Sequence, residues 1–284
     1  MKAPIIFSIQ YFNDKNVKDC NGADIEDYLF SIQNISEKTR YNKCSNLHDF
    51  WNWLLRRAVI NTNQMPVFPK IPYELGYRNI IDWKTQQTII DEVYRIAKNP
   101  KVGFGIELLS TYPALRPGDL LKIKESDIDL NHGEIIIHNP TKSKNKFKQI
   151  LLLSEHVKRF KFFKEHYTGF PSLPFFRHIP GISGAKANKL FGHKQFYKWW
   201  IKACENLGIE GIDLYGGTRH TTTTEIARRQ GEDKAIKATG HETNKAFRRY
   251  CQVQDNTALE MAKLTMNERE GNRTQIVDFK KYAN

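Results

Sequence analysis

Four short segments, far apart in the chain, carry residue types that suit chemistry on a phosphate ester. The first is TYPALRPGDLLKIKESDIDL, in which Arg116 follows an apolar run. The second is TKSKNKFK with Lys142, and the third is DLYGGTRHTTTTEIA, in which Arg219 opens a predicted helix. The fourth is KATGHETNKAFRRY, where Tyr250 follows His241 by nine positions.

Arginine, histidine and tyrosine together fit displacement at a phosphodiester. Such a displacement adds negative charge to the phosphate oxygens, and guanidinium groups aimed at those oxygens stabilise the transition state. Arg116 and Arg219 could clamp one phosphate, to which His241 would donate a further hydrogen bond. A phenol is a poor nucleophile at neutral pH because its ordinary pKa is about 10. A guanidinium-rich pocket favours the phenolate, so it would activate Tyr250 as the nucleophile.

At these residues the chain resembles the tyrosine recombinase, or phage integrase, family. Arg116, the Asp119-Leu120-Leu121 stretch and the Asp127-Ile128-Asp129 turn follow the course of the family's first arginine box. Arg219 corresponds to the second arginine, and Gly240-His241 precedes Tyr250 at the family's spacing. The likeness covers roughly residues 20–260 and rests on four boxes in the right order.

The resemblance implies a site-specific recombinase that cleaves DNA through a 3′-phosphotyrosine intermediate on Tyr250 and then religates the strands. Lys142 would protonate the departing 5′ oxygen, and Lys144 competes with it for this role. The phosphotyrosine bond conserves the energy of the broken linkage, so we expect no cofactor, neither ATP nor a metal ion. The implied partner is double-stranded DNA with a specific recombination site, bound by a homotetramer on two duplexes. Integration, excision and resolution all stay open.

One position departs from the family's pattern. The second arginine box would place a histidine at position 216, where this chain has Gly216. In the family that histidine helps to accept the proton of the tyrosine. Water, Tyr215 or His220 could take over in part, or the arginine pocket could lower the pKa of Tyr250 enough.

Two other functions compete with recombination. The missing histidine supports a catalytically silent DNA-binding regulator on a recombinase scaffold. A type IB topoisomerase would use similar residues to relax DNA without exchanging partners. The separate helical unit at 24–60, which resembles the family's core-binding domain, favours recombination.

The elements that must position these residues are mostly helical. Apolar residues at helical spacing predict a helix over 24–33 and a longer one with Ser36 as its N-cap. The apolar face of the longer helix is predicted to carry Leu47, Phe50, Trp51, Leu54, Leu55 and Ala58. Further helices are predicted through 89–96, 104–109, 155–167, 194–207 and 219–230, with shorter ones near Lys234 and Phe247. The apolar runs at 133–138 and 149–153 predict a β-hairpin around the basic loop of Lys142.

The fold class expected is therefore mainly α with a small antiparallel β-sheet. It would form a two-domain tyrosine recombinase architecture, a helical core-binding domain plus a mixed α/β catalytic domain. The core-binding domain would span 1–64 and the linker 65–80, where three prolines favour an extended path. The catalytic domain would span 81–284, with a C-terminal tail from about 267. A separate N-terminal arm-binding domain is not expected.

Composition agrees with a folded, DNA-binding protein. Hydrophobic residues make up 40% of the 284 residues, which excludes a disordered chain, and the net charge of +13 favours polyanion partners. The four cysteines are scattered without metal spacing, and no stretch predicts a membrane helix, so a cytoplasmic, DNA-associated protein is expected. The side chains predicted to contact DNA are Lys38, Arg40, Lys43, Arg56, Arg57, Lys144 and Lys146.

Overall fold

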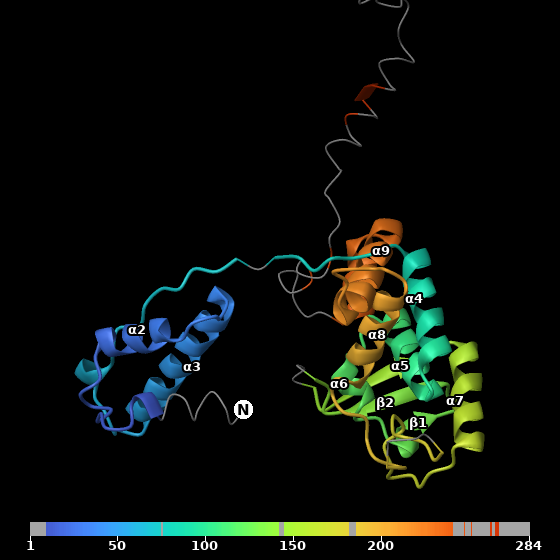
Figure 1. Ribbon diagram of the computed structural model, residues 1–284, viewed down its shortest axis with the longest axis horizontal. Helices are drawn as coiled ribbons and strands as arrows, with labels where there is room; N and C mark the ends of the chain where they lie inside the picture. The colour runs from blue at the N-terminus through green and yellow to red at the C-terminus, as the bar shows by residue number, and fades with distance from the viewer. Residues whose placement is uncertain are drawn as a thin grey trace, which may run out of the picture. The chain divides into compact units, whose positions relative to one another are not determined.

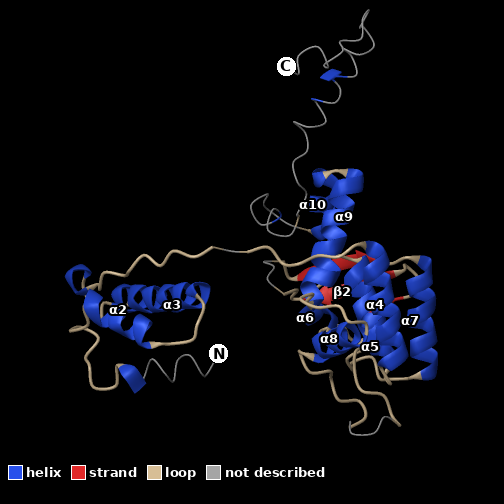
Figure 2. Ribbon diagram, turned by 45° about the horizontal axis from the view of Figure 1, so that its top comes forward, coloured by secondary structure: helices blue, strands red, loops and turns tan. Residues whose placement is uncertain are grey.

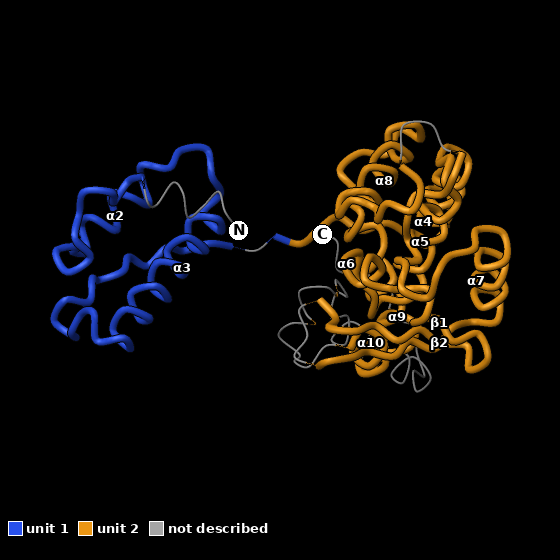
Figure 3. Tube along the Cα trace, turned by 90° about the horizontal axis from the view of Figure 1, so that it is seen from below, with its two compact units in different colours: residues 1–76 blue, residues 77–284 orange. Residues whose placement is uncertain are grey.

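A computed structural model describes residues 10–74, 76–141, 145–181 and 186–240, with Phe247, Cys251, Ala262, Thr265 and Met266. The chain divides into two compact units, residues 1–76 and 77–284, coloured blue and orange in Figure 3. Helices predominate among the described residues, whose strands all belong to the second unit (Figures 1 and 2). The predicted fold class, mainly α with a small antiparallel sheet, is confirmed.

The first unit is built on two helices that pack together, α2 (Gly22–Ser31) and α3 (Glu37–Arg56). Asn21 begins α2 by accepting hydrogen bonds from two main-chain N–H groups of the first turn. Ser36 begins α3, as predicted, and its hydroxyl accepts from the N–H of Thr39 at 3.3 Å. Both caps supply acceptors to N–H groups that a helix start leaves without carbonyl partners.

The core of the first unit lies between α2 and α3. Its most buried side chains are Ile25, Tyr28, Leu29, Leu47, Trp51, Leu54 and Ile60. The predicted apolar face of α3 is wrong at two positions. Phe50 is 43% exposed. Ala58 is exposed beyond the end of the helix, with a left-handed φ of 55°.

The second unit holds most of the helices. They are α4 (Trp83–Ile96), α5 (Pro100–Thr111), α6 (Pro117–Leu120), α7 (Ser154–His166), α8 (Gln195–Asn206), α9 (Thr221–Gln230) and α10 (Glu232–Thr239). Helices α4, α5 and α8 pack on one another around a continuous apolar core. Phe196 and Trp200 of α8 are fully buried there. The short helix predicted near Phe247 falls largely outside the described residues.

The sheet has three antiparallel strands in the order β1 (Ile128–Asp129), β2 (Glu134–His138) and β3 (Phe147–Leu151). The predicted hairpin is β2 and β3, while β1 was read from the sequence as a turn. In the register, Ile135 faces Ile150 and Ile137 faces Lys148. Ile135, Ile137 and Ile150 are buried, so Lys148 lies on the strand face that is turned toward the core.

The segment between α3 and α4 packs in two parts. After the short turn η1 (Thr62–Gln64), Ile71 is buried in the core of the first unit. Asn79 and Ile81 instead belong to the second unit and bond within it. The Asn79 Nδ2 group donates to the Gly211 carbonyl at 3.0 Å, and the Ile81 N–H donates to Thr221 Oγ1 at 3.2 Å.

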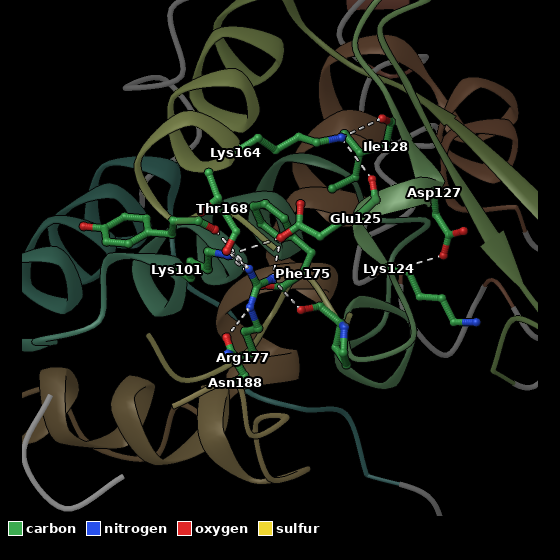
Figure 4. Close-up of polar contacts among 12 residues, drawn as sticks. Lys101, Lys124, Glu125, Asp127, Ile128, Lys164, Thr168, Phe175, Arg177 and Asn188 are labelled. Carbon is green, nitrogen blue, oxygen red and sulfur yellow. Dashed lines mark hydrogen bonds and ion pairs between the residues drawn. The ribbon is translucent and has the colours of Figure 1, made fainter. Parts of the chain in front are cut away.

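A buried polar centre fixes the loops around residues 125 and 175 (Figure 4). The Arg177 guanidinium pairs with Glu125, and both side chains are almost fully buried. The Lys101 ammonium lies 3.8 Å from the same carboxylate and donates to the Phe175 carbonyl at 2.9 Å. Burial, together with the charge of Arg177, lowers the pKa of Lys101 to about 7. The centre thus ties α5 to the loops around 125 and 175.

Across the described part of the chain, none of the helices has the length and apolar character needed to cross a bilayer.

Candidate active site

The turn between α5 and α6 carries Arg116. This side chain is half-buried, and its Nη1 group donates to the Thr141 carbonyl at 3.0 Å. The fully buried Asp119 carboxylate accepts from the main-chain N–H of Arg116 at 3.2 Å and from that of Thr141 at 2.6 Å. Asp119 therefore holds the arginine turn against the end of the hairpin segment that leads to Lys142.

Arg219 comes from a distant part of the sequence and reaches the same turn between α5 and α6. It lies in a π-helical turn, Gly216–His220, that runs into α9, and it is 1% exposed. Its guanidinium donates to the Pro113 carbonyl and, at 3.4 Å, to the Thr239 carbonyl. The helix predicted from 219 thus begins with a π turn, a distortion that often occurs at functional sites.

Two glycines allow this π turn to pack closely. A Cβ atom on Gly217 would lie 2.1 Å from the Trp200 ring, and one on Gly216 would lie 2.3 Å from the Asn79 carbonyl oxygen. The space of a side chain at position 216 is therefore filled by the main chain of residue 79. A histidine cannot stand there unless that segment moves.

Lys148 is a third cation at the turn, and it was not among the predicted site residues. Its Nζ group donates to the Ala114 carbonyl at 2.5 Å. A Cβ atom on Gly240 would lie 4.0 Å from the same Nζ. Burial lowers the pKa of Lys148 to about 8, with Asp119 opposing and the charges of Arg116 and Arg219 adding to the shift. Its position on the inward face of β3 was the sequence signal that could have revealed it.

The structure thus brings Arg116, Arg219 and Lys148 together around residues 113–116. Four other predicted site residues, Lys142, Lys144, His241 and Tyr250, lie outside the described residues. Thr141 and Gly240, which directly precede Lys142 and His241 in the sequence, are both described and both lie next to this cluster.

The basic residues predicted to contact DNA differ in their surroundings. Arg56, Arg57 and Lys146 are exposed, and Lys43 is half-buried. The Lys38 ammonium lies over the Tyr73 ring, 3.7 Å from its centroid. Arg40 requires a correction. It is only 9% exposed and its guanidinium donates to the carbonyls of Leu29 and Ile32, so it holds the end of α2 instead of facing solvent.

Of the two residues considered as substitutes for the missing histidine, Tyr215 directly precedes the π turn and His220 is its last residue. Tyr215 is half-buried, with the Arg78 guanidinium 5.5 Å from its ring centroid, and Arg78 also pairs with Asp213. His220 is 5% exposed. Within the described residues, no three His, Cys, Asp or Glu side chains gather as a metal-binding group.

Comparisons with known proteins agree with this geometry. A family model described as the phage integrase family matches residues 104–257, more than half of the chain. No curated protein sequence matches.

Solved structures with a similar fold are recombinases and integrases. A lambda integrase dimer bound to a COC′ core site has 15% sequence identity over 87% of this chain and 85% of that chain, with a TM-score of 0.64. The Tn1549 transposon integrase in complex with a circular intermediate DNA has 12% identity over 91% of both chains, also with a TM-score of 0.64. The XerH site-specific recombinase bound to its difH substrate has 16% identity over 90% of this chain and 77% of that chain, with a TM-score of 0.62.

Proposed function

Because the chain belongs to the phage integrase family of DNA breaking and rejoining enzymes, we propose that it recombines DNA at specific sites through a covalent bond between Tyr250 and the 3′ phosphate. The observation that carries the proposal is the convergence of Arg116 and Arg219 on one short turn, from segments about a hundred residues apart. Both are held by main-chain carbonyls, so a phosphate would meet guanidinium groups that are already in position.

The chemistry follows from that placement. The Tyr250 oxygen attacks the phosphorus, the bond to the 5′ oxygen breaks, and the arginines stabilise the charge that develops on the phosphate oxygens. His241 donates a hydrogen bond to the same phosphate. A 5′ hydroxyl from another strand then attacks the phosphotyrosine, which releases Tyr250 and joins the new partners.

The partner is double-stranded DNA. The net charge of +13 favours polyanions, and the lambda, Tn1549 and XerH proteins named above were each solved on DNA. Exposed basic residues on the first unit, such as Arg56 and Arg57, are proposed phosphate contacts. A homotetramer on two duplexes would provide the four tyrosines needed to exchange both strands of each.

The proton of Tyr250 has three candidate acceptors, Tyr215, His220 and water. The cleavage rate is measured against pH for Tyr215→Phe and for His220→Gln. If the rate of one variant no longer rises with pH, the residue replaced in that variant is the base. Unchanged profiles in both variants would assign the proton to water, with the arginine pocket lowering the pKa of the phenol.

Covalent trapping tests the proposed function. The chain's DNA site is first selected by binding from a pool of random duplexes, and a nicked version of that site then serves as a suicide substrate. We expect a denaturant-resistant protein–DNA adduct that disappears in Tyr250→Phe. The control is Tyr197→Phe, because Tyr197 is 46% exposed on α8 and should be dispensable.

The same assay separates the competing functions. Tight binding to the selected site without any adduct would support a silent DNA-binding regulator. An adduct with relaxation of supercoiled plasmid, but without exchange between two sites, would support a topoisomerase.

A further inference from the structure

A buried glutamine on α4 contacts the π turn that carries Arg219. Gln86 is 6% exposed, and its Nε2 group donates to the Gly217 carbonyl at 2.7 Å and to the Thr218 carbonyl at 3.4 Å. Both carbonyls belong to the π turn and lie within two residues of Arg219. A buried amide N–H group needs an acceptor, and a π turn departs from the regular hydrogen-bond pattern of an α-helix. The glutamine therefore holds the main chain of the π turn from a separate helix.

The same amide group begins a second set of hydrogen bonds, which leads to α5. Gln86 Nε2 also donates to Thr222 Oγ1 at 3.2 Å, and this hydroxyl donates to the Ser110 carbonyl at 2.6 Å. All three residues are buried. Ser110 lies in the last turn of α5, and the turn that carries Arg116 follows directly. One glutamine thus joins the two segments that bring arginines to the site.

We propose that Gln86 is a positioning residue for DNA cleavage, which places Arg219 relative to Arg116. Under the proposed function, on which this inference rests, both guanidinium groups must meet the oxygens of one phosphate. The Arg219 guanidinium donates to the Pro113 carbonyl, which links the two segments at the tip of that side chain. The bonds of Gln86 link the main chains behind the arginines, and α4 itself packs against both α5 and α9. Such a link matters because a displacement of about 1 Å can slow a reaction by about 10²-fold.

Single-turnover cleavage measures positioning separately from folding. The variant is Gln86→Met, which keeps the length of the side chain and removes its N–H groups. The full chain is mixed with an excess of the selected suicide duplex, and the covalent adduct is followed in time. An unfolded fraction of the protein lowers the final amount of adduct, whereas a displaced arginine lowers the rate constant.

For Gln86→Met we expect the rate constant to fall by about 10–10²-fold. The Kd for the duplex should stay within about threefold of the wild-type value, because a buried side chain that acts only in the chemical step does not contribute to DNA binding. Thr222→Val removes a single hydroxyl from the same set of bonds, so it should also lower the rate constant. This second variant keeps the test decisive if the methionine variant folds poorly.

The matched control is Asn99→Leu. Asn99 is 5% exposed, and its Nδ2 group also donates to a main-chain carbonyl, that of Arg177 at 3.1 Å. This variant loses a buried amide donor at the opposite end of α5 from the arginine turn. It should therefore lose stability as Gln86→Met does, yet cleave with the wild-type rate constant.

A double-mutant cycle tests whether Gln86 acts through Arg219. Arg219→Lys alone should slow cleavage because the planar fork of the guanidinium is lost. Adding Gln86→Met should slow this variant by less than about threefold more, because the fork that Gln86 positions is already gone. Two independent effects would multiply instead.

Three results would overturn the inference while the wild-type chain still forms the adduct, so that the proposed function stands. The first is a wild-type rate constant in either Gln86→Met or Thr222→Val, whatever the amount of adduct. The second is multiplication of the two effects in the double variant. The third is a rate constant for Asn99→Leu as low as that of Gln86→Met, which would trace the loss to general destabilisation. If the wild-type chain itself forms no adduct, the proposed function fails and the inference with it.

Discussion

Replacing Gly216 with alanine should damage the second unit although the change adds a single methyl group. The new Cβ would lie 2.3 Å from the Asn79 carbonyl oxygen and 3.2 Å from Asp213 Oδ1. The first of these contacts is with main chain, so a side-chain rotation cannot relieve it. Residues 78–81 must move, and that movement strains the bonds from Asn79 to Gly211 and from Ile81 to Thr221.

The cost follows from these contacts. Overpacking of a close-packed site typically costs about 1–3 kcal/mol, and each weakened hydrogen bond adds about 0.5–1.5 kcal/mol. We expect Gly216→Ala to lower the free energy of unfolding by about 2–4 kcal/mol. For a unit of this size that corresponds to a melting temperature roughly 4–16 °C lower. Arg219 shares the π turn with Gly216, so the rate of covalent adduct formation should fall as well.

Urea unfolding of the full chain, followed by tryptophan fluorescence, measures the effect. The matched control is Gly192→Ala, because a Cβ atom at exposed Gly192 meets nothing within 4 Å. It should change the free energy of unfolding by less than about 0.5 kcal/mol. If Gly216→Ala proves as stable as Gly192→Ala, residues 78–81 do not occupy the side-chain space at position 216. In that case Gly216→His should restore a general base. If Gly216→Ala is destabilised as expected, Gly216→His should not restore a general base.

Three further predictions concern charged residues. Arg116→Lys should slow adduct formation at least about 10²-fold, because the planar fork is lost, while the melting temperature of this half-buried site stays unchanged. The wild-type chain should gain stability between pH 7 and pH 10, by up to about 1.4 kcal/mol per pH unit, because unfolded Lys101 binds a proton that the folded group, with its pKa of about 7, releases. Lys148, whose folded pKa is about 8, adds a gain of its own above pH 8. In urea titrations Lys101→Met should therefore lose the gain between pH 7 and pH 8 and keep part of the gain above it, and a curve parallel to that of the wild type would contradict the assignment. Arg40→Met should destabilise the first unit by about 1–3 kcal/mol without changing the salt dependence of DNA binding, whereas Arg56→Met should lower the slope of log Kd against log salt by about 0.9.

Much of the fold follows from local patterns in the sequence. Ser36 begins α3 as predicted because a hydroxyl before an apolar periodic run supplies the missing acceptor. Helix α8 matches the predicted 194–207 within one residue at each end, since its aromatic side chains recur at helical spacing. Strand β1 was missed because two residues cannot show a period, and its place is set by pairing of Ile128 with Ile135.

The candidate site was predictable only in part. The sequence marked Arg116 and Arg219 separately, yet their meeting at residues 113–116 depends on packing between segments that share no local pattern. The lack of space for a side chain at Gly216 could not be predicted for the same reason, because the main chain of Asn79 fills that space. A missing side chain in one motif says nothing about which distant segment fills its place.

Arg40 and Lys148 show that the position of a basic residue in the periodic pattern of its helix or strand predicts whether its side chain turns inward. Helical and strand periodicity applies to basic residues as well as to apolar ones. Arg40 precedes the buried Cys44 by four positions, and Lys148 precedes the buried Ile150 by two, so each lies on the inward face of its element. An inward cation must find an acceptor. Arg40 finds the carbonyls at the end of α2, a fixed structural partner. Lys148 finds a carbonyl of a turn that already gathers two arginines, where an anion would be a stronger partner than the carbonyl it holds.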